Sequence, residues 1–251
     1  MRALALILCL LPLPARADCV VLLHGLSRSD ASMLVLQQVL EFHHYHVVNE
    51  TYPSDDAPIG ELVQYVARSA SLCGDERMHF VTHSLGGILV RAWLAQGHPP
   101  NLGRVVMLAP PNHGSEIVDA LRSSEFVSEV VTFLNGPATN QLGTDAESVP
   151  NQLPAVDFDL GVIAGNLPIN PIGAVLIDGP SDGTVSVAST RIEGMSDHVV
   201  IPASHTLIMM NPEAMAEVLE FLRNGVFDHG LTLGTALRKL ANPWPAVEST
   251  P

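Results

Sequence analysis

The chain has 251 residues, which is enough for one domain with a sizeable hydrophobic core. It contains 26 acidic and 12 basic residues, and its formal net charge is −14. Binding to phosphate backbones or anionic membranes needs a basic patch, so this balance argues against nucleic acid as a partner and favours a neutral or apolar ligand.

Residues 1–17 have the pattern of a cleaved export signal. A positive charge at Arg2 precedes an apolar run over residues 3–13, which is too short to span a bilayer. Small residues then form a small-x-small cleavage pattern at residues 15–17. We therefore expect a mature chain that begins at Asp18, has no integral membrane segment and is periplasmic or secreted. A retained N-terminal anchor is the alternative.

Apolar runs rich in β-branched residues alternate with helical patterns along the rest of the chain. The expected strands cover residues 20–23, 45–49, 79–81, 104–108, 158–164 and 198–201. The expected helices cover residues 33–43, 59–70, 88–94 and 212–222. Continuous apolar strands that alternate with helices predict an α/β fold, with a mostly parallel sheet and helices on both of its faces.

The predicted domain covers residues 18–227. The alternation breaks over about 116–154, where a helical piece from Ile117 to Leu134 precedes a stretch rich in Gly, Pro and Asn. We interpret this segment as a small cap inserted over the edge of the sheet. Residues 228–251 have weak periodicity and end in a Pro-containing polar segment, so we expect a loosely ordered C-terminal extension.

Two cysteines remain after removal of the export signal, because Cys9 lies within it. Cys19 and Cys73 each precede an expected strand. If these strands are parallel neighbours, both cysteines lie at the same edge of the sheet. An oxidising compartment favours a disulfide between them, and two buried free thiols are the alternative.

A strand-like run ends at Ser84, the glycines Gly86 and Gly87 follow, and a helical pattern then begins at Ile88. A serine between a strand and a helix lies on a sharp turn, which small neighbours allow. The turn presents the hydroxyl beside the free amides at the helix N-terminus. This is the local geometry of an activated nucleophile, although a turn that merely contains serine is the simpler interpretation.

Serine is a weak nucleophile at neutral pH and needs a base, usually histidine, which a carboxylate orients. In a parallel α/β sheet the ligand site lies beyond the carboxyl ends of the strands, so the partners should follow strands. His205 follows the last expected strand, and Asp182 lies in the loop before that strand. The expected catalytic residues are therefore Ser84, Asp182 and His205, with Asp178 as the alternative acid.

Acyl chemistry at this serine also needs donors for the oxyanion of the tetrahedral intermediate. The backbone amide of Leu85 follows the serine, and the loop after the first strand supplies the amide of Leu26. We expect the wall of the substrate pocket to include His24, Gly25, His83 and Ile117.

Three close histidines, His43, His44 and His46, are the alternative for a metal site. Apart from the first and last, their spacing is not that of a helical ligand pair, and no Cys or carboxylate motif accompanies them. We therefore expect neither a metal nor another cofactor.

Together these motifs resemble the α/β-hydrolase superfamily, and within it the bacterial lipases and esterases with an Ala/Thr-His-Ser-x-Gly-Gly nucleophile elbow. The resemblance covers about residues 20–222, and the chain order Ser, Asp, His is the order of that superfamily. The segments that carry it are 20–26, 82–87, 111–115 and 182–185, together with His205.

The resemblance implies ester hydrolysis through an acyl-enzyme, without a metal or organic cofactor. It also implies that the first strand and the nucleophile strand are adjacent, which supports pairing of Cys19 with Cys73. One residue departs from the family pattern: Thr82 stands where Gly or Ala is usual, so the elbow must accommodate a β-branched side chain.

The sequence thus predicts an exported serine carboxylic-ester hydrolase, a lipase or esterase, whose partner is a small-molecule or lipid ester with an apolar acyl group. An acyltransferase or lipid deacylase with the same three residues is one alternative. A non-catalytic binding or chaperone-like module is another, and the complete Ser, Asp and His set argues against it. The sequence makes no prediction of oligomeric state.

Overall fold

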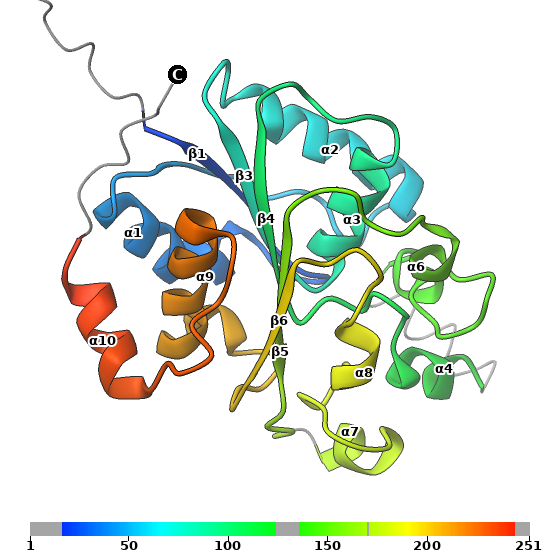
Figure 1. Cartoon of the computed structure of the whole chain (residues 1–251). Helices are drawn as coiled ribbons and strands as arrows, with labels where there is room; N and C mark the ends of the chain where they lie inside the picture. The colour runs from blue at the N-terminus through cyan, green and yellow to red at the C-terminus, as the bar shows by residue number, and fades with distance from the viewer. Residues whose placement is uncertain (1–16, 124–135, 170, 244–251) are drawn as a thin grey trace, which may run out of the picture.

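A computed structural model describes residues 17–123, 136–169 and 171–243 of the chain. Its centre is one sheet of six parallel strands in the order β2-β1-β3-β4-β5-β6 (Figure 1). The strands are β1 (Cys19–Leu23), β2 (His46–Asn49), β3 (Met78–His83), β4 (Leu102–Leu108), β5 (Leu160–Gly165) and β6 (Asp197–Ile201). The strand predictions and the α/β fold class are confirmed, and the sheet is parallel throughout.

Helices cover both faces of the sheet (Figure 1). The longer helices are α1 (Leu34–Phe42), α2 (Ile59–Ser71), α3 (Leu85–Leu94), α4 (Glu116–Arg122), α9 (Pro212–Asn224) and α10 (Leu233–Ala241). The shorter ones are η1 (Asp30–Met33), η2 (Thr139–Gln141), α6 (Val149–Gln152), α7 (Pro171–Leu176), α8 (Val187–Thr190) and η3 (Ile208–Met210). One hydrophobic cluster joins the sheet to α2 and α3, and another joins its opposite face to α1 and α9. Within the described ranges, no helix has the length and apolar character needed to cross a bilayer.

The two-sided core explains why β1 is apolar at every position. Val20 and Leu22 pack in the cluster with α1 and α9, whereas Val21 and Leu23 pack in the cluster with α2 and α3. Successive side chains of a strand point to opposite faces, so a strand that is covered on both faces needs an unbroken apolar run. The same alternation holds in β3, where Phe80 and Val81 belong to opposite clusters.

The strand order places the carboxyl ends of the central strands side by side. β1 pairs with β2 on one side and with β3 on the other, so the chain changes direction across the sheet at β1. β3 in turn pairs with β4, with His83 opposite Leu108. Loops that leave parallel strands beside such a switch point form the usual ligand site of an open α/β sheet.

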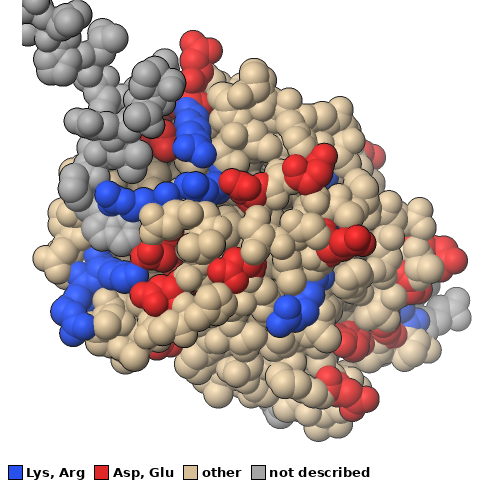
Figure 2. Space-filling model, in the orientation of Figure 1, with Lys and Arg blue, Asp and Glu red and all other residues tan. Residues whose placement is uncertain are grey.

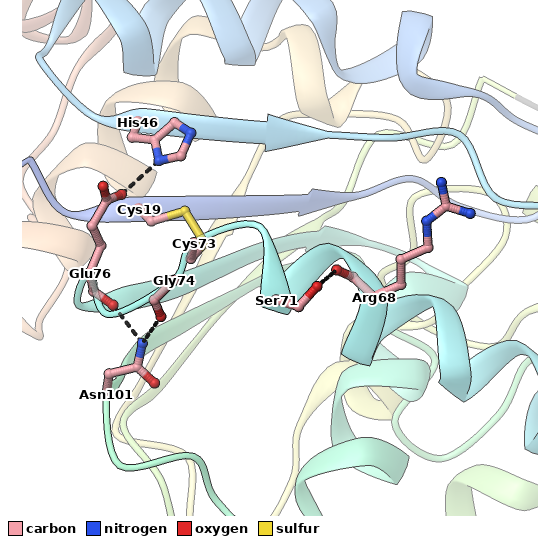
Figure 3. Close-up of a disulfide and its surroundings, with 8 residues drawn as sticks. All are labelled: Cys19, His46, Arg68, Ser71, Cys73, Gly74, Glu76 and Asn101. Carbon is pink, nitrogen blue, oxygen red and sulfur yellow. Dashed lines mark hydrogen bonds and ion pairs between the residues drawn. A yellow bond between two sulfur atoms is a disulfide. The ribbon is translucent and has the colours of Figure 1, made fainter.

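A disulfide joins Cys19, at the start of β1, to Cys73, in the loop after α2 (Figure 3). Their Cα atoms are 5.6 Å apart, and both side chains are buried. β1 and β3 are hydrogen-bonded neighbours, as the resemblance implies, so the residues that precede the two strands meet at one edge of the sheet. The predicted pairing is confirmed.

Removal of this disulfide should lower the free energy of unfolding substantially. The bond spans 54 residues, and the loop-closure entropy that it removes from the unfolded chain corresponds to about 4 kcal/mol. We expect the double variant Cys19→Ser/Cys73→Ser to lose stability by about this amount in urea unfolding. Wild-type protein treated with a reductant should unfold at the same denaturant concentration as the variant. A loss below about 1 kcal/mol in both samples would contradict a stabilising role for the disulfide.

The three close histidines do not converge on a common point. His43 is buried and lies 3.3 Å from a backbone carbonyl of α10, whereas His44 is exposed. The His46 Nδ1 atom lies 2.6 Å from a carboxylate oxygen of Glu76 (Figure 3). The sulfur of Cys19 is near that pair, but it is bonded in the disulfide and does not offer a thiolate.

The C-terminal region differs from the expectation of a loosely ordered extension. Helix α10 packs against α9, and Lys239 bridges Glu220 at 2.5 Å and Asp228 at 3.0 Å. Thr232 and Thr235 form a reciprocal capping box at the start of α10. The prediction was wrong for residues 228–243, because the helix is short and its stabilising partners lie outside it, on α9 and at Asp228.

The expected cap is described only in part. Residues 124–135 lie outside the described residues, as do residues 1–16 of the expected export signal (1–17) and the end of the chain over 244–251. The helical piece predicted from Ile117 to Leu134 is described as far as Arg122, as α4. Helix α4 is capped by the Ser115 hydroxyl, and this positions its first turn at the carboxyl edge of the sheet.

Candidate active site

Ser84 occupies a sharp turn between β3 and α3. Its backbone angles are φ 51° and ψ −120°, a conformation that is costly for a residue other than glycine. Its amide donates to the Leu108 carbonyl at 3.0 Å, which ties the turn to the end of β4. A Cβ atom on Gly86 would lie 2.6 Å from the Leu23 carbonyl oxygen, so only glycine lets α3 start this close to β1.

Thr82, the departure from the family pattern, is fully buried at the end of β3. It lies beside Leu23 of β1 and Met107 of β4 in the sheet register. Its hydroxyl has no hydrogen-bond partner among the described residues. The elbow therefore accommodates the β-branched side chain, at the cost of one buried hydroxyl without a partner.

The structure brings Ser84, His205 and Asp182 into one hydrogen-bonded line. The Ser84 Oγ atom lies 3.1 Å from Nε2 of His205, and Nδ1 of His205 lies 2.7 Å from Oδ2 of Asp182. His205 also donates its backbone amide to the Asp182 carbonyl at 3.1 Å. A hydroxyl that faces an imidazole held by a carboxylate can lose its proton as it attacks an electrophile.

Asp182 is oriented by the loop that carries it. The backbone amides of Thr184 and Val185 donate to its Oδ1 atom at 2.9 Å and 2.8 Å, which leaves Oδ2 for His205. The side chain is buried, and Gly183 follows it with φ 93°, so the chain turns directly behind the carboxylate. The alternative acid, Asp178, is exposed, and no hydrogen bond joins it to His205 in the described part of the chain.

His83 contacts His205 and helps to hold it in place, a role that the sequence did not predict. Its Nε2–H donates to the backbone carbonyl of His205 at 2.9 Å, and the two ring centres are 4.8 Å apart. Burial lowers the pKa of His83 well below its usual value, so the ring is neutral at pH 7. The contact spans 122 residues of sequence, and no local pattern points to it.

An apolar pocket of about 240 Å³ opens beside Ser84. Its wall includes two of the expected residues, His83 and Ile117, and also Leu26. Other apolar side chains that line it are Pro111, Val118, Leu121, Leu142 and Val185. Ser84 itself is 9% exposed, so its hydroxyl lies at the pocket surface while most of the residue is covered.

His24 and Gly25 are not on the wall of this pocket, which corrects the prediction for these two residues. The His24 ring is fully buried and stacks on Tyr52, with ring centres 4.1 Å apart. Its Nδ1–H donates to the Gly25 carbonyl, and its Nε2 accepts the Tyr52 amide. A Cβ atom on Gly25 would lie 2.7 Å from the His83 ring and 3.2 Å from the Ser84 side chain. Both residues shape the loop that passes against the elbow.

The two expected oxyanion donors belong to two different segments near Ser84. Leu85 is the first residue of α3, so its amide has no acceptor one turn earlier in the helix. Leu26 lines the same pocket as Ser84, from the loop after β1. Among the described residues, no backbone carbonyl accepts a hydrogen bond from the Leu26 amide.

Comparisons with known proteins give matches to solved structures only. No family model and no curated protein matches the chain. The mature form of the lipase BlEst2 from Bacillus licheniformis is 19% identical, with a TM-score of 0.62 over 84% of this chain and 94% of that one. The phospholipase PlaB from Legionella pneumophila is 18% identical, with a TM-score of 0.66 over 90% of this chain but only 62% of that one. A metagenomic carboxyl esterase, MGS0156, is 16% identical, with a TM-score of 0.57 over 76% of this chain and 65% of that one.

At these identities the likeness establishes the fold. The sheet order, the strained serine between β3 and α3 and the structural matches agree on it. The chain has the α/β-hydrolase fold, and the solved structures that it resembles include lipases, esterases and phospholipases.

Proposed function

We propose that the chain is a serine carboxylic-ester hydrolase that works through an acyl-enzyme. The observation that carries this proposal is the hydrogen-bonded line from Ser84 through His205 to the buried Asp182, at the surface of an apolar pocket. The fold shared with lipases, esterases and phospholipases supports it. The complete set of three residues argues against a non-catalytic module on the same fold.

In the proposed reaction, Ser84 Oγ attacks the acyl carbonyl while Nε2 of His205 accepts the hydroxyl proton. Asp182 holds His205 in the tautomer with hydrogen on Nδ1 and stabilises the imidazolium that forms. His205 then donates its proton to the departing alcohol, which leaves the acyl group on Ser84. A water molecule attacks this ester with His205 again as the base, and the acid is released.

The negative oxygen of the tetrahedral intermediate is assigned to the amides of Leu26 and Leu85. Each such donor contributes about 3–4 kcal/mol of transition-state stabilisation in comparable sites. The loop with Leu26 is fixed by the Ser27 amide, which donates to Asp55 at 2.8 Å. The position of the Leu26 amide therefore depends on this loop, which passes close to the turn at Ser84.

We place the acyl group in the apolar pocket beside Ser84. Its lining includes Ile117 and Val118, from the first turn of α4, together with Leu142 and Val185. A volume of about 240 Å³ is below the roughly 300–1,000 Å³ of pockets that hold drug-sized ligands, which favours short or medium acyl chains. The disulfide supports an oxidising compartment, and we propose that the chain is exported.

A series of p-nitrophenyl esters from acetyl to palmitoyl tests this function. We expect release of nitrophenol and of the free acid, with the highest kcat/KM at short or medium chain length. Transfer of the acyl group to an added alcohol in preference to water would identify an acyltransferase instead. No release above that of a heat-inactivated sample with any chain length would contradict the proposal.

A further inference from the structure

A second hollow adjoins the apolar pocket at the mouth of the site. It is lined on one side by the loop after β1, with Ser29 and Ser32, and on the other by Thr206 and Met210. Ser27 and Arg28 line both hollows. Ser84 and His205 line the pocket, and Thr206, the next residue in the chain, lines the second hollow. An ester at Ser84 could thus place its acyl part in one hollow and its alcohol part in the other.

The two hollows are both mostly apolar, and both also carry hydroxyl groups. Ser29, Ser32 and Thr206 line the second hollow, and Ser115, Thr139 and Thr184 line the pocket. Neither is lined by an Asp or a Glu, although the whole chain has 26 acidic and 12 basic residues. Arg28 is the one Arg or Lys among their lining residues. Arg28 is thus a cation at the mouth of a site whose lining residues include no carboxylate.

The guanidinium of Arg28 is not used by the fold. Its side chain is half-buried and makes no ion pair or hydrogen bond with the described residues. Two carboxylates beside this loop already have partners: Asp55 accepts from Ser27 and Ser54, and Asp30 accepts from Thr51. Arg28 is close enough to His83 to help lower its pKa, although burial is the main cause.

We propose that Arg28 binds an anionic group, a phosphate, on the alcohol part of the substrate. This inference rests on the proposed ester hydrolysis, and it assigns the substrate class as acyl esters of phosphorylated alcohols. A planar guanidinium can donate two parallel hydrogen bonds to a phosphate, which a neutral alcohol cannot match. Ser29 and Thr206 place hydroxyl groups in the same hollow, where they can donate to the remaining phosphate oxygens.

The net charge of −14 does not oppose this binding at short range. Figure 2 shows acidic side chains scattered over the face in view, with basic ones between them. At physiological ionic strength the screening length is about 8 Å, so distant carboxylates act weakly on a bound phosphate. The interaction with Arg28 is a direct contact and is screened much less.

The test compares two substrates with the same acyl group, 1-octanoylglycerol and 1-octanoylglycerol 3-phosphate. For the wild-type enzyme we expect a kcat/KM at least tenfold higher for the phosphorylated ester. In Arg28→Gln the ratio of the two kcat/KM values should fall about 30-fold, mainly through KM for the phosphorylated ester. Arg28→Lys, which keeps the charge but not the paired donors, should retain an intermediate ratio.

Arg68→Gln is the matched control, because Arg68 is exposed on α2 and pairs with Glu50 away from both hollows. It should keep the wild-type ratio, and the melting temperatures of all variants check their folding. A wild-type preference for the neutral ester, or a ratio that Arg28→Gln leaves unchanged, would overturn the assignment. p-Nitrophenyl octanoate is assayed in parallel: activity on it without any preference for the phosphate refutes this inference alone, whereas inactivity on all three esters refutes the proposed function.

Discussion

Replacement of Ser84 by alanine should reduce ester hydrolysis by about 10⁵-fold or more, and leave only the weak catalysis that substrate binding and the oxyanion donors still provide. The variant removes only the hydroxyl. The conformational free energy of holding alanine at φ 51° equals that of holding serine there, so the turn and the fold should persist. The measurement is kcat for a short-chain p-nitrophenyl ester, with circular dichroism to show that the variant is folded.

Ser71→Ala is a suitable control for this experiment. Ser71 is exposed at the end of α2, where its hydroxyl donates to the Arg68 carbonyl, and it lies outside the pocket. Its activity should equal that of the wild type. If Ser84→Ala is folded and retains more than about 1% of wild-type kcat, the nucleophile has been assigned to the wrong residue.

The second large effect is expected at Asp182, where asparagine should reduce kcat by about 10⁴-fold. The geometry specifies how this loss arises. Thr184 and Val185 donate two amides to one oxygen of Asp182, and the asparagine carbonyl can accept both. Its NH₂ group is then turned toward Nδ1 of His205. The ring must accept there, so it carries its hydrogen on Nε2 and cannot take the serine proton.

Asp178→Asn provides the matched comparison, because this residue lies in the same loop region but is exposed. It should leave kcat within about twofold of the wild type, while Asp182→Asn melts near the wild-type temperature yet is almost inactive. The reverse pattern, with the large loss at Asp178, would show that the acid assignment is wrong.

Much of the fold could be predicted from the sequence because its strands are buried on both faces. An unbroken run such as Val20 to Leu23 is compatible with few other environments, and the helices between such runs have clear apolar faces. The position of a residue after a strand also fixed the edge of the sheet on which it would lie. The sequence therefore predicts that Ser84, Asp182 and His205 lie at the same edge, and in the structure hydrogen bonds join them there.

The features that were missed depend on contacts between distant segments. His24 follows β1 as a pocket residue would, but its ring turns inward because Tyr52, 28 residues later, stacks on it and hydrogen-bonds to its backbone carbonyl. His83 reaches the backbone of His205 across 122 residues. Helix α10 is short and gains its stability from packing on α9 and from ion pairs of Lys239 with Glu220 and Asp228, which its own sequence does not reveal.

The role of Arg28 was missed for a different reason. Its charge is one of only 12 basic charges in an acidic chain, and the overall balance pointed to a neutral or apolar ligand. Net charge averages over the whole surface, whereas a binding site depends on the few groups that line it. No Asp or Glu lines either hollow, a local feature that the net charge does not reveal.

The most direct measurement for this account is the site of covalent labelling by a fluorophosphonate, which reacts with serines activated by a neighbouring base. The account predicts one adduct per chain, located by peptide mass spectrometry on Ser84, and no adduct in Ser84→Ala. The same reagent should label Asp182→Asn far more slowly, because His205 no longer accepts the proton. A stable protein that forms no adduct, or one that carries it on another residue, would contradict the assignment of Ser84, His205 and Asp182 as a catalytic unit.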